Sequence, residues 1–224
     1  MQHLVRDCFR GQGYRFASGA FDIARTCGWD RVARLGSNES PYPPSPLAIA
    51  RATEALASAN RYPDEHMGSL VDALRRAFGD HAFVTGAGMD GVIETVIRAT
   101  VDAGDRVAIS TPTFSFYGIA ARAQGGIPHP IPRDRDFAVD AGRVIEESRG
   151  ATITFLCTPN NPTGNATPPE VIGEICDGIE GMLFLDNAYV EFAALDYLPL
   201  LHRFDNLIIG RTFSKAYALA GLRV

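Results

Sequence analysis

Short apolar segments alternate with helix-like segments through most of the chain, and this alternation limits the fold more than any other feature. The expected strands are 83–85, 106–110, 126–131, 152–157, 182–186 and 206–210. The expected helices are 46–60, 69–78, 89–101, 114–123, 139–148 and 168–179. Strands that alternate with helices predict a parallel sheet covered by helices on both faces. The expected fold class is therefore α/β, with three layers.

The N-terminal residues do not share this pattern. Residues 1–36 are rich in arginine, glycine and aromatic side chains without a clear period, which indicates an arm or a short helix. In 37–46, closely spaced prolines exclude a helix interior and predict a rigid extended segment. We therefore expect an N-terminal arm at 1–44 and one large domain at 45–224.

Composition excludes several classes of protein. The 224 residues carry 21 Lys+Arg against 26 Asp+Glu, a net charge of −5, and 46% are hydrophobic, which predicts a folded chain rather than a disordered one. A mildly acidic chain without basic clusters does not suit nucleic acid. No run approaches the roughly 18 apolar residues of a membrane span. The N-terminus lacks the apolar core of a secretory signal, which favours a cytoplasmic protein.

Cysteine and histidine spacing predicts neither disulfides nor a metal site. The four cysteines, Cys8, Cys27, Cys157 and Cys176, include no C-x-x-C pair. The five histidines are never close enough in sequence to suggest metal ligands. We expect free cysteines in a reducing compartment and no bound metal.

Polar or glycine-rich residues follow several of the expected strands, at 85–88, 158–161, 186–189 and 211–215. In α/β sheets, ligands bind outside the carboxyl ends of the strands. These junctions are therefore where a functional site is expected.

The last junction carries a lysine, Lys215, among small and apolar residues. Partial burial lowers the pKa of a lysine and suits Schiff-base chemistry, although a surface lysine in a loop remains the simpler alternative. Ser214, Thr212 and Arg223 supply two hydroxyls and a cation, which suit a bound phosphate.

Asp186 ends an apolar strand, where a carboxylate is costly unless it is paired. A protonated pyridine nitrogen would be such a partner, and Tyr189 could reach the same ligand. The alternative is an aspartate that caps the following turn. The glycines of 86–88 precede a helix, whose N-terminus is a plausible phosphate seat, while Asp90 could merely complement the helix dipole.

These residues resemble the fold-type I aminotransferases, which use pyridoxal 5′-phosphate. The motifs are Asn-Pro-Thr-Gly at 161–164, Asp186-x-x-Tyr189, and Ser214-Lys215 with Arg223 eight residues on. Three further motifs resemble the histidinol-phosphate aminotransferase branch: Asn-Glu-Ser-Pro at 38–41, Arg-Tyr-Pro-Asp at 61–64 and Arg-Thr-Phe-Ser-Lys at 211–215. The resemblance covers about residues 35–224 and implies the large, cofactor-binding domain of the aspartate aminotransferase fold.

The resemblance implies a role for each residue around the cofactor ring. Lys215 would bond covalently to the cofactor and carry a proton between it and the substrate. Asp186 would pair with the pyridine nitrogen, and Asn161 and Tyr189 would bind the phenolic oxygen. Tyr117 would lie against the ring, unless it is an ordinary aromatic of an amphipathic helix.

The resemblance also assigns the phosphate and implies a partner. Ser214, Arg223 and the helix start at Met89 and Asp90 would hold the phosphate. Tyr62 would reach the phosphate of the neighbouring subunit, which implies a homodimer; the alternative is a loop tyrosine packed beside its proline.

The implied activity is transfer of an amino group between an amino acid, or an amino-acid phosphate such as histidinol phosphate, and a 2-oxo acid. Three positions depart from the family's usual motifs: Ser40, Gly91 and Asn187. Two alternatives use the same residues: a decarboxylase on the same fold and a regulatory module that binds the cofactor. The family continues with a strand and a small C-terminal domain beyond the position of Val224, so we expect this chain alone to be an inactive fragment.

Overall fold

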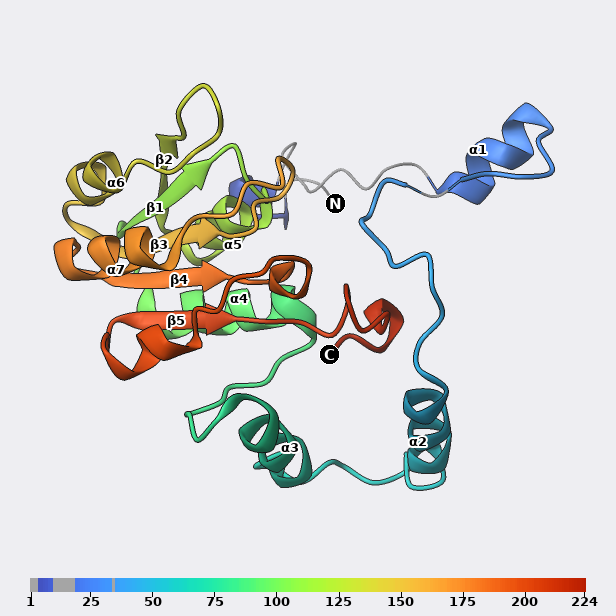
Figure 1. Cartoon of the computed structure of the whole chain (residues 1–224). Coiled ribbons are helices and arrows are strands. Elements are labelled where there is room, and N and C mark those ends of the chain that lie inside the picture. The colour runs from blue at the N-terminus through green and yellow to red at the C-terminus, as the bar shows by residue number, and fades with distance from the viewer. Residues whose placement is uncertain (1–3, 10–18, 34) are drawn as a thin grey trace.

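The computed structural model describes residues 4–9, 19–33 and 35–224. Their centre is a sheet of five parallel strands in the order β2-β1-β3-β4-β5 (Figure 1). The strands are β1 (Arg106–Thr111), β2 (Ile127–Pro132), β3 (Ala151–Cys157), β4 (Met182–Asp186) and β5 (Leu207–Gly210). The predicted parallel α/β fold is confirmed.

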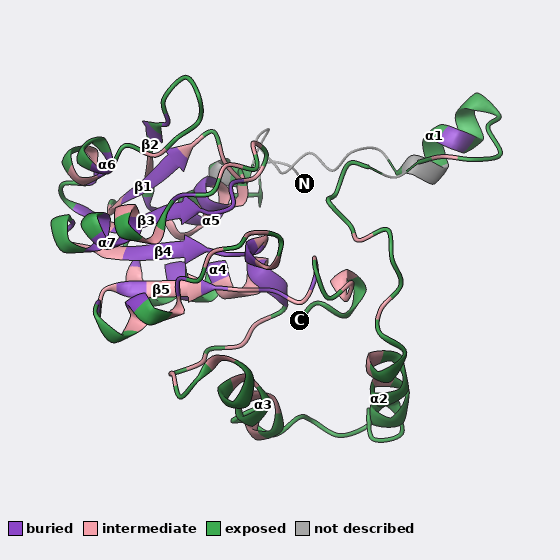
Figure 2. Cartoon of the chain, in the orientation of Figure 1, coloured by how far each residue is buried: buried purple, intermediate pink, exposed green. Residues whose placement is uncertain are grey.

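Helices cover both faces of this sheet. The helices α4 (Gly88–Thr100) and α5 (Phe116–Gln124) pack on one face, and α6 (Ala141–Glu147) and α7 (Pro169–Gly178) pack on the other. Figure 2 shows the burial concentrated in the strands and in the helix faces turned toward them. The arrangement has the three layers that the alternation of elements predicts.

The side chains of β3 explain why both faces are covered. Ile153 and Phe155 join the core beneath α4 and α5, while Leu156 joins the core beneath α7, and none of the three is exposed to solvent. Successive side chains of a strand point to opposite faces, so an uninterrupted apolar strand requires cover on both sides.

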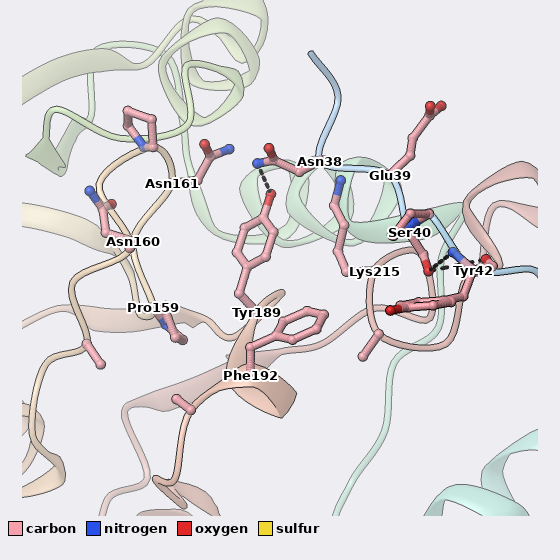
Figure 3. A pocket seen from close by; sticks show the side chains of 16 residues that line it. Asn38, Glu39, Ser40, Tyr42, Pro159, Asn160, Asn161, Tyr189, Phe192 and Lys215 are labelled. Carbon is pink, nitrogen blue, oxygen red and sulfur yellow. Dashed lines mark hydrogen bonds between the residues drawn. The ribbon is translucent and has the colours of Figure 1, made fainter. Parts of the chain in front are cut away.

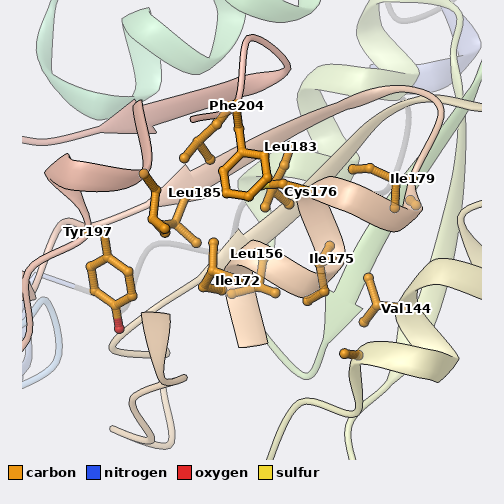
Figure 4. Packing of buried hydrophobic residues seen from close by; sticks show 14 of the residues in the cluster. Val144, Leu156, Ile172, Ile175, Cys176, Ile179, Leu183, Leu185, Tyr197 and Phe204 are labelled. Atoms are coloured by element: carbon orange, nitrogen blue, oxygen red, sulfur yellow. The ribbon is translucent and has the colours of Figure 1, made fainter. Parts of the chain in front are cut away.

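On the α7 face, Ile172 and Ile175 pack with Leu183 and Leu185 of β4 and with Phe204 from the segment before β5 (Figure 4). All five are buried. At about 25 cal/mol per Å² of buried apolar surface, such clusters are the main stabilising term of the domain. They fix β4 and β5 side by side, which positions the residues that follow these strands.

Three helices lie outside the layers: α1 (Ala20–Cys27), α2 (Pro46–Leu56) and α3 (Gly68–Phe78) (Figure 1). Neither α2 nor α3 has a buried residue. One described contact of α3 with the sheet domain is Phe78, whose ring lies 4.4 Å from the Arg211 guanidinium. Short 3-10 helices complete the chain: η2 (Asp7–Phe9), η3 (Val190–Phe192), η4 (Leu198–His202) and η5 (Ala220–Leu222).

One expected strand is absent. Residues 83–85 have no strand partner, and Val84 is 67% exposed. A strand needs a neighbour to pair its backbone groups, and β5, at the edge of the sheet, is not paired with this segment. The other expected strands and helices form, with ends shifted by a few residues; α2 ends at Leu56 rather than near 60.

The expected arm at 1–44 is only partly described, because residues 1–3, 10–18 and 34 lie outside the described residues. Residues 37–45 form no helix, as the prolines predict, and α2 begins at Pro46. The segment is not extended throughout, however: Asn38 has a left-handed φ of +49°, and the chain bends at 41–42. Among the described residues, no helix has the length and apolar character needed to cross a membrane.

Candidate active site

The carboxyl ends of β3, β4 and β5 bring their loops to one edge of the sheet. In the strand register, Cys157 lies opposite Asp186, and Asp186 lies opposite Gly210. The loops that follow therefore start at the same level on three adjacent strands. The sequence predicts this convergence from the polar residues at each strand end.

These loops form a pocket of about 690 Å³ with the segment 38–42 (Figure 3). The pocket is lined by Asn161 from the loop after β3, Tyr189 and Phe192 from the loop after β4, and Lys215 from the loop after β5. Such a volume suits a small organic ligand.

The segment before α2 closes one side of the pocket. The Ser37 carbonyl oxygen accepts a hydrogen bond of 2.9 Å from Lys215 Nζ, and Asn38 Nδ2 donates one of 3.0 Å to the Tyr189 hydroxyl. Asn38 belongs to the motif at 38–41, but its place in the pocket was not predicted from the sequence. The one sequence feature that could have pointed to Asn38 is the pair of polar residues, Asn38 and Glu39, just before the proline-rich segment.

Lys215 is half-buried, with Nζ 5.7 Å from the centre of the Tyr189 ring. Burial lowers its pKa, an effect that the nearby carboxylates of Glu39 and Asp90 oppose and the Arg223 charge reinforces. A lowered pKa increases the fraction of free amine, which is the nucleophilic form. Lys215 is also the only lysine in the sequence, which by itself sets this residue apart.

Asp186 is buried at the end of β4, with 3% of its surface exposed. Its Oδ1 accepts a hydrogen bond of 2.9 Å from the Ala188 amide, and its Oδ2 accepts one of 2.5 Å from the Tyr117 hydroxyl. Burial raises the pKa of this carboxyl, and the two hydrogen bonds oppose that rise. The expected contact with the following turn is therefore present, beside the capacity to pair with a cation.

Tyr117 faces the sheet and does not line the pocket. Its side chain has no exposed surface; its ring stacks on Phe155 at 4.9 Å between centroids and 14° between planes. The contact between this ring and a cofactor stays a prediction. Its hydroxyl alone reaches the site, through Asp186.

The first residues of α4 and Arg223 together form a candidate anion-binding site, here named the anion seat. Arg223 Nη2 lies 3.5 Å from Asp90 Oδ2 and 3.5 Å from the Ala87 carbonyl oxygen. Gly88 has a φ of +68°, and a Cβ there would lie 2.5 Å from Arg223 Nη2, so only glycine lets the guanidinium approach this closely. The first amides of α4, including that of Met89, have no partner within the helix and carry its positive dipole end.

Thr212 and Ser214 provide two hydroxyls near the anion seat, since Thr212 Oγ1 lies 3.2 Å from the carbonyl oxygen of Val224, the residue after Arg223. Thr212 Oγ1 also donates to Ser214 Oγ at 3.0 Å, and both side chains are buried. A guanidinium, a helix N-terminus and hydroxyls together suit a phosphate group.

In the loop after β3, Asn160 makes the structural bonds and leaves Asn161 in the pocket. Asn160 Nδ2 donates to the Pro112 carbonyl oxygen at 3.1 Å and to Thr163 Oγ1 at 2.9 Å. Asn161 is half-buried and lines the same pocket as Tyr189 (Figure 3). Asn160 lines the pocket too, but it is 3% exposed and its side chain is committed to these bonds, whereas Asn161 is the more accessible of the two.

Asn187, one of the departures from the usual motif, ties two loops together. Asn187 is 2% exposed. Its side-chain Nδ2 donates to the Thr158 carbonyl oxygen at 2.7 Å, and its backbone N–H donates to the Gly210 carbonyl oxygen at 2.8 Å. A carboxylate at this position has no proton to donate to that carbonyl oxygen.

Tyr62 lies away from this site. Its side chain is fully exposed, at 101% of the reference value, in the connection between α2 and α3. Among the expected residues, Lys215, Tyr189 and Asn161 line the pocket. The charges of Asp186, Asp90 and Arg223 act on Lys215 from the same edge of the sheet, although these side chains do not line the pocket. Ser214 precedes Lys215, Met89 precedes Asp90, and Tyr62 lies outside the pocket.

Comparison with known proteins agrees with this geometry. The family model "Aminotransferase class I and II" matches residues 30–224. The histidinol-phosphate aminotransferase of Methanoculleus marisnigri is 60% identical over 225 residues, which cover 100% of this chain and 64% of that protein. That of Methanosphaerula palustris is 55% identical over 226 residues, with the same coverage. The chain thus spans 64% of the length of these relatives.

Solved structures show the same fold. Histidinol-phosphate aminotransferase from Sinorhizobium meliloti, in complex with pyridoxal-5′-phosphate, superposes with a TM-score of 0.81 at 30% identity, over 93% of this chain and 59% of that chain. Aspartate aminotransferase from Thermus thermophilus with maleate superposes with a TM-score of 0.79 at 23% identity, over 91% of this chain and 58% of that chain. The parallel sheet, the loops at its carboxyl edge and these matches lead to one conclusion: the chain belongs to the class I and II aminotransferase family.

Proposed function

We propose that this chain is the cofactor-binding part of an aminotransferase that uses pyridoxal 5′-phosphate. The observation that carries the proposal is the convergence of a half-buried lysine, a buried aspartate and an anion seat at one edge of the sheet. Residues 45–224 would form the cofactor-binding domain, with 1–44 as an arm beside it.

The donor set fits this cofactor group by group. Arg223, Ser214 and the start of α4 suit its phosphate, and the space that a Cβ at Gly88 would fill is where the guanidinium approaches the helix. The Asp186 carboxylate suits a protonated ring nitrogen. The Tyr189 hydroxyl and the Asn161 amide suit the phenolic oxygen.

When bound, the cofactor supplies an electron sink for bond breaking at the α-carbon of an amino acid. The chain's own part is binding and proton transfer. Lys215 would be the residue that holds the cofactor covalently, and its Nζ is also placed to serve as the general base for the α-proton of an amino-acid substrate. Its lowered pKa leaves more of the amine free near neutral pH. Asp186, held from two sides, would keep the ring nitrogen protonated.

We further propose an amino-acid phosphate of the histidinol-phosphate type as amino donor, a 2-oxo acid as acceptor, and the cytoplasm as location. The support is the 60% identity to a histidinol-phosphate aminotransferase and the motifs at 38–41 and 61–64. Homodimer formation belongs to the same proposal, with the fully exposed Tyr62 reaching the neighbouring subunit's site. Sedimentation of the cofactor-loaded protein as a monomer would contradict the dimer.

The decisive experiment is borohydride reduction of the purified chain after addition of pyridoxal 5′-phosphate, followed by peptide mass spectrometry. Because Lys215 is the only lysine, an adduct on an ε-amine identifies the site without ambiguity. Lys215→Arg keeps the positive charge and removes the reactive amine, so it serves as the matched control. Circular dichroism confirms that both proteins are folded.

An adduct on Lys215 in the wild type alone is the expected result. A folded wild-type chain that acquires no adduct would contradict the cofactor assignment. Activity is then assayed on a longer protein that also carries a region equivalent to the part of these relatives that this chain does not span. Amino transfer to a 2-oxo acid supports the aminotransferase, whereas release of CO₂ without transfer would identify a decarboxylase.

A further inference from the structure

The Tyr117 hydroxyl and the Asp186 carboxylate form a buried pair at the carboxyl edge of the sheet, and the proposed function gives the Tyr117 side chain no role beyond holding Asp186. The two residues belong to α5 and to the end of β4, 69 positions apart in sequence, and they meet at 2.5 Å. Tyr117 has no exposed surface, and Asp186 has 3%. Their contact is thus made by the fold and not by a ligand.

The rest of the Tyr117 side chain is held as firmly as its hydroxyl. The ring stacks on Phe155 at 4.9 Å and meets Phe114 edge-on at 5.7 Å. These contacts leave the hydroxyl little freedom to move. A donor that is already oriented loses little entropy when it binds an anion, which strengthens its effect on the carboxylate.

The carboxylate itself is fixed from both sides. Tyr117 donates to Oδ2, and the Ala188 amide donates to Oδ1. Each carboxylate oxygen can accept more than one hydrogen bond, so both keep capacity for a cationic donor. Two donors on different oxygens set the plane of the group before any ligand arrives.

We propose that Tyr117 is a positioning residue for Asp186: its hydroxyl keeps the buried carboxylate ionised and oriented toward a cationic ring nitrogen. The proposal rests on the cofactor assignment for its consequence in catalysis, but the coupling between the two residues is a property of the chain alone. In this role Tyr117 acts through Asp186.

Other ionisable groups face this pair from the neighbouring elements. Asp90 in α4 disfavours a charge on Asp186, and Lys215 favours it. The Cys157 thiol at the end of β3 stays neutral there, because burial and the Asp186 carboxylate raise its pKa. Arg133 interacts with both Cys157 and Tyr117. Tyr117 is the group that donates a hydrogen bond directly to the carboxylate from α5. Its removal therefore shifts the balance toward the protonated acid, which cannot pair with a cation.

The experiment compares Tyr117→Phe with Tyr197→Phe. Both changes remove one hydroxyl from a fully buried ring; the Tyr197 hydroxyl lies on the opposite face of the sheet, where it donates to the Thr167 carbonyl oxygen at 2.6 Å. Unfolding by urea is measured without cofactor at several pH values from 5 to 9. Cofactor affinity is then measured at neutral pH by fluorescence quenching.

In Tyr117→Phe, the loss of stability should grow with pH as Asp186 ionises in the folded state, reaching roughly ten- to a hundredfold in the unfolding constant, the size of a hydrogen bond to a charged group. In Tyr197→Phe the loss should be the same at every pH. In an Asp186→Asn background, the pH-dependent part of the Tyr117→Phe effect should vanish. The factor by which cofactor affinity falls should be at least ten times larger for Tyr117→Phe than for Tyr197→Phe.

A Tyr117→Phe effect that is flat with pH overturns the proposal, and so does one that persists in the Asp186→Asn background. If Tyr117→Phe alone does not fold, Asp186→Asn carries the test, because its stability relative to wild type must then rise with pH. A wild-type chain that shows the coupling but binds no cofactor refutes the proposed function and leaves the coupling standing. If Tyr117→Phe shows the pH-dependent loss of stability but binds the cofactor as tightly as wild type, the positioning role is refuted.

Discussion

Replacement of Asn187 by aspartate tests how the loops of the site are held together. The two side chains have nearly the same shape, but the carboxylate lacks the proton that Asn187 Nδ2 donates to the Thr158 carbonyl oxygen at 2.7 Å. The change also places a second acid next to the buried Asp186. Because the position is 2% exposed, water cannot replace the lost donor.

The size of the effect follows from the cost of keeping the new carboxyl protonated. With an ordinary pKa of about 3.9, protonation costs about 1.4 kcal/mol for each pH unit above that value, or roughly 4 kcal/mol at pH 7 and 1.5 kcal/mol at pH 5. The folded state raises the pKa of this carboxyl above its unfolded value. The destabilisation is therefore absent below the unfolded pKa and grows as pH rises toward the folded pKa. Between pH 5 and pH 7 we expect the unfolding free energy of Asn187→Asp to fall by roughly a further 2–3 kcal/mol relative to wild type.

Urea unfolding of wild type, Asn187→Asp and Asn187→Ala at the two pH values checks this. The alanine variant leaves the Thr158 carbonyl oxygen without its donor and should lose about 1–3 kcal/mol equally at both. An Asn187→Asp protein whose loss of stability does not change between pH 5 and pH 7 would refute the reasoning, since it would mean that the carboxylate finds a donor or water at this position.

Three further predictions concern the pocket and the sheet. Gly88→Ala should cost about 1–2 kcal/mol for its left-handed backbone and weaken cofactor binding roughly tenfold, because the new Cβ displaces the Arg223 guanidinium; a cofactor titration checks it. Gly210→Ala places a Cβ 2.6 Å from the Phe184 ring and should lower the unfolding free energy by about 1–3 kcal/mol, measured by urea unfolding. Lys215, whose pKa burial lowers, should react with an amine reagent at lower pH than free N-acetyl-lysine, and mass spectrometry of its one labelled peptide gives the profile. A reaction profile that matches the free amine would contradict the burial.

The layers of the fold could be predicted because the relevant signals are local. The strand 151–157 is apolar at nearly every position, and only a strand covered on both faces has that pattern. The strand predicted at 83–85 does not form, because strand formation there depends on a non-local contact. Whether a short apolar segment becomes a strand depends on a partner elsewhere in the chain, and no local pattern reports whether that partner exists.

The residues of the site fall into the same two groups. Asp186 ends β4, and Lys215 lies in the loop that begins after β5, so their position at the carboxyl edge follows from the strand pattern. Asn38 comes from a segment without periodic structure, and its contact with Tyr189 spans 151 positions in sequence. Such a contact depends on where an extended segment crosses the domain, which propensity and periodicity do not describe.

Tyr117 shows how a residue can act on a site through a second residue. Its ring shares a helix face with Ala120 and Ala121, three and four positions later, and all three are buried. That face packs on the sheet beside Phe155. The period of the helix therefore predicts the direction of the ring. The hydrogen bond from its hydroxyl to Asp186 joins residues 69 positions apart, and no local pattern describes such a contact.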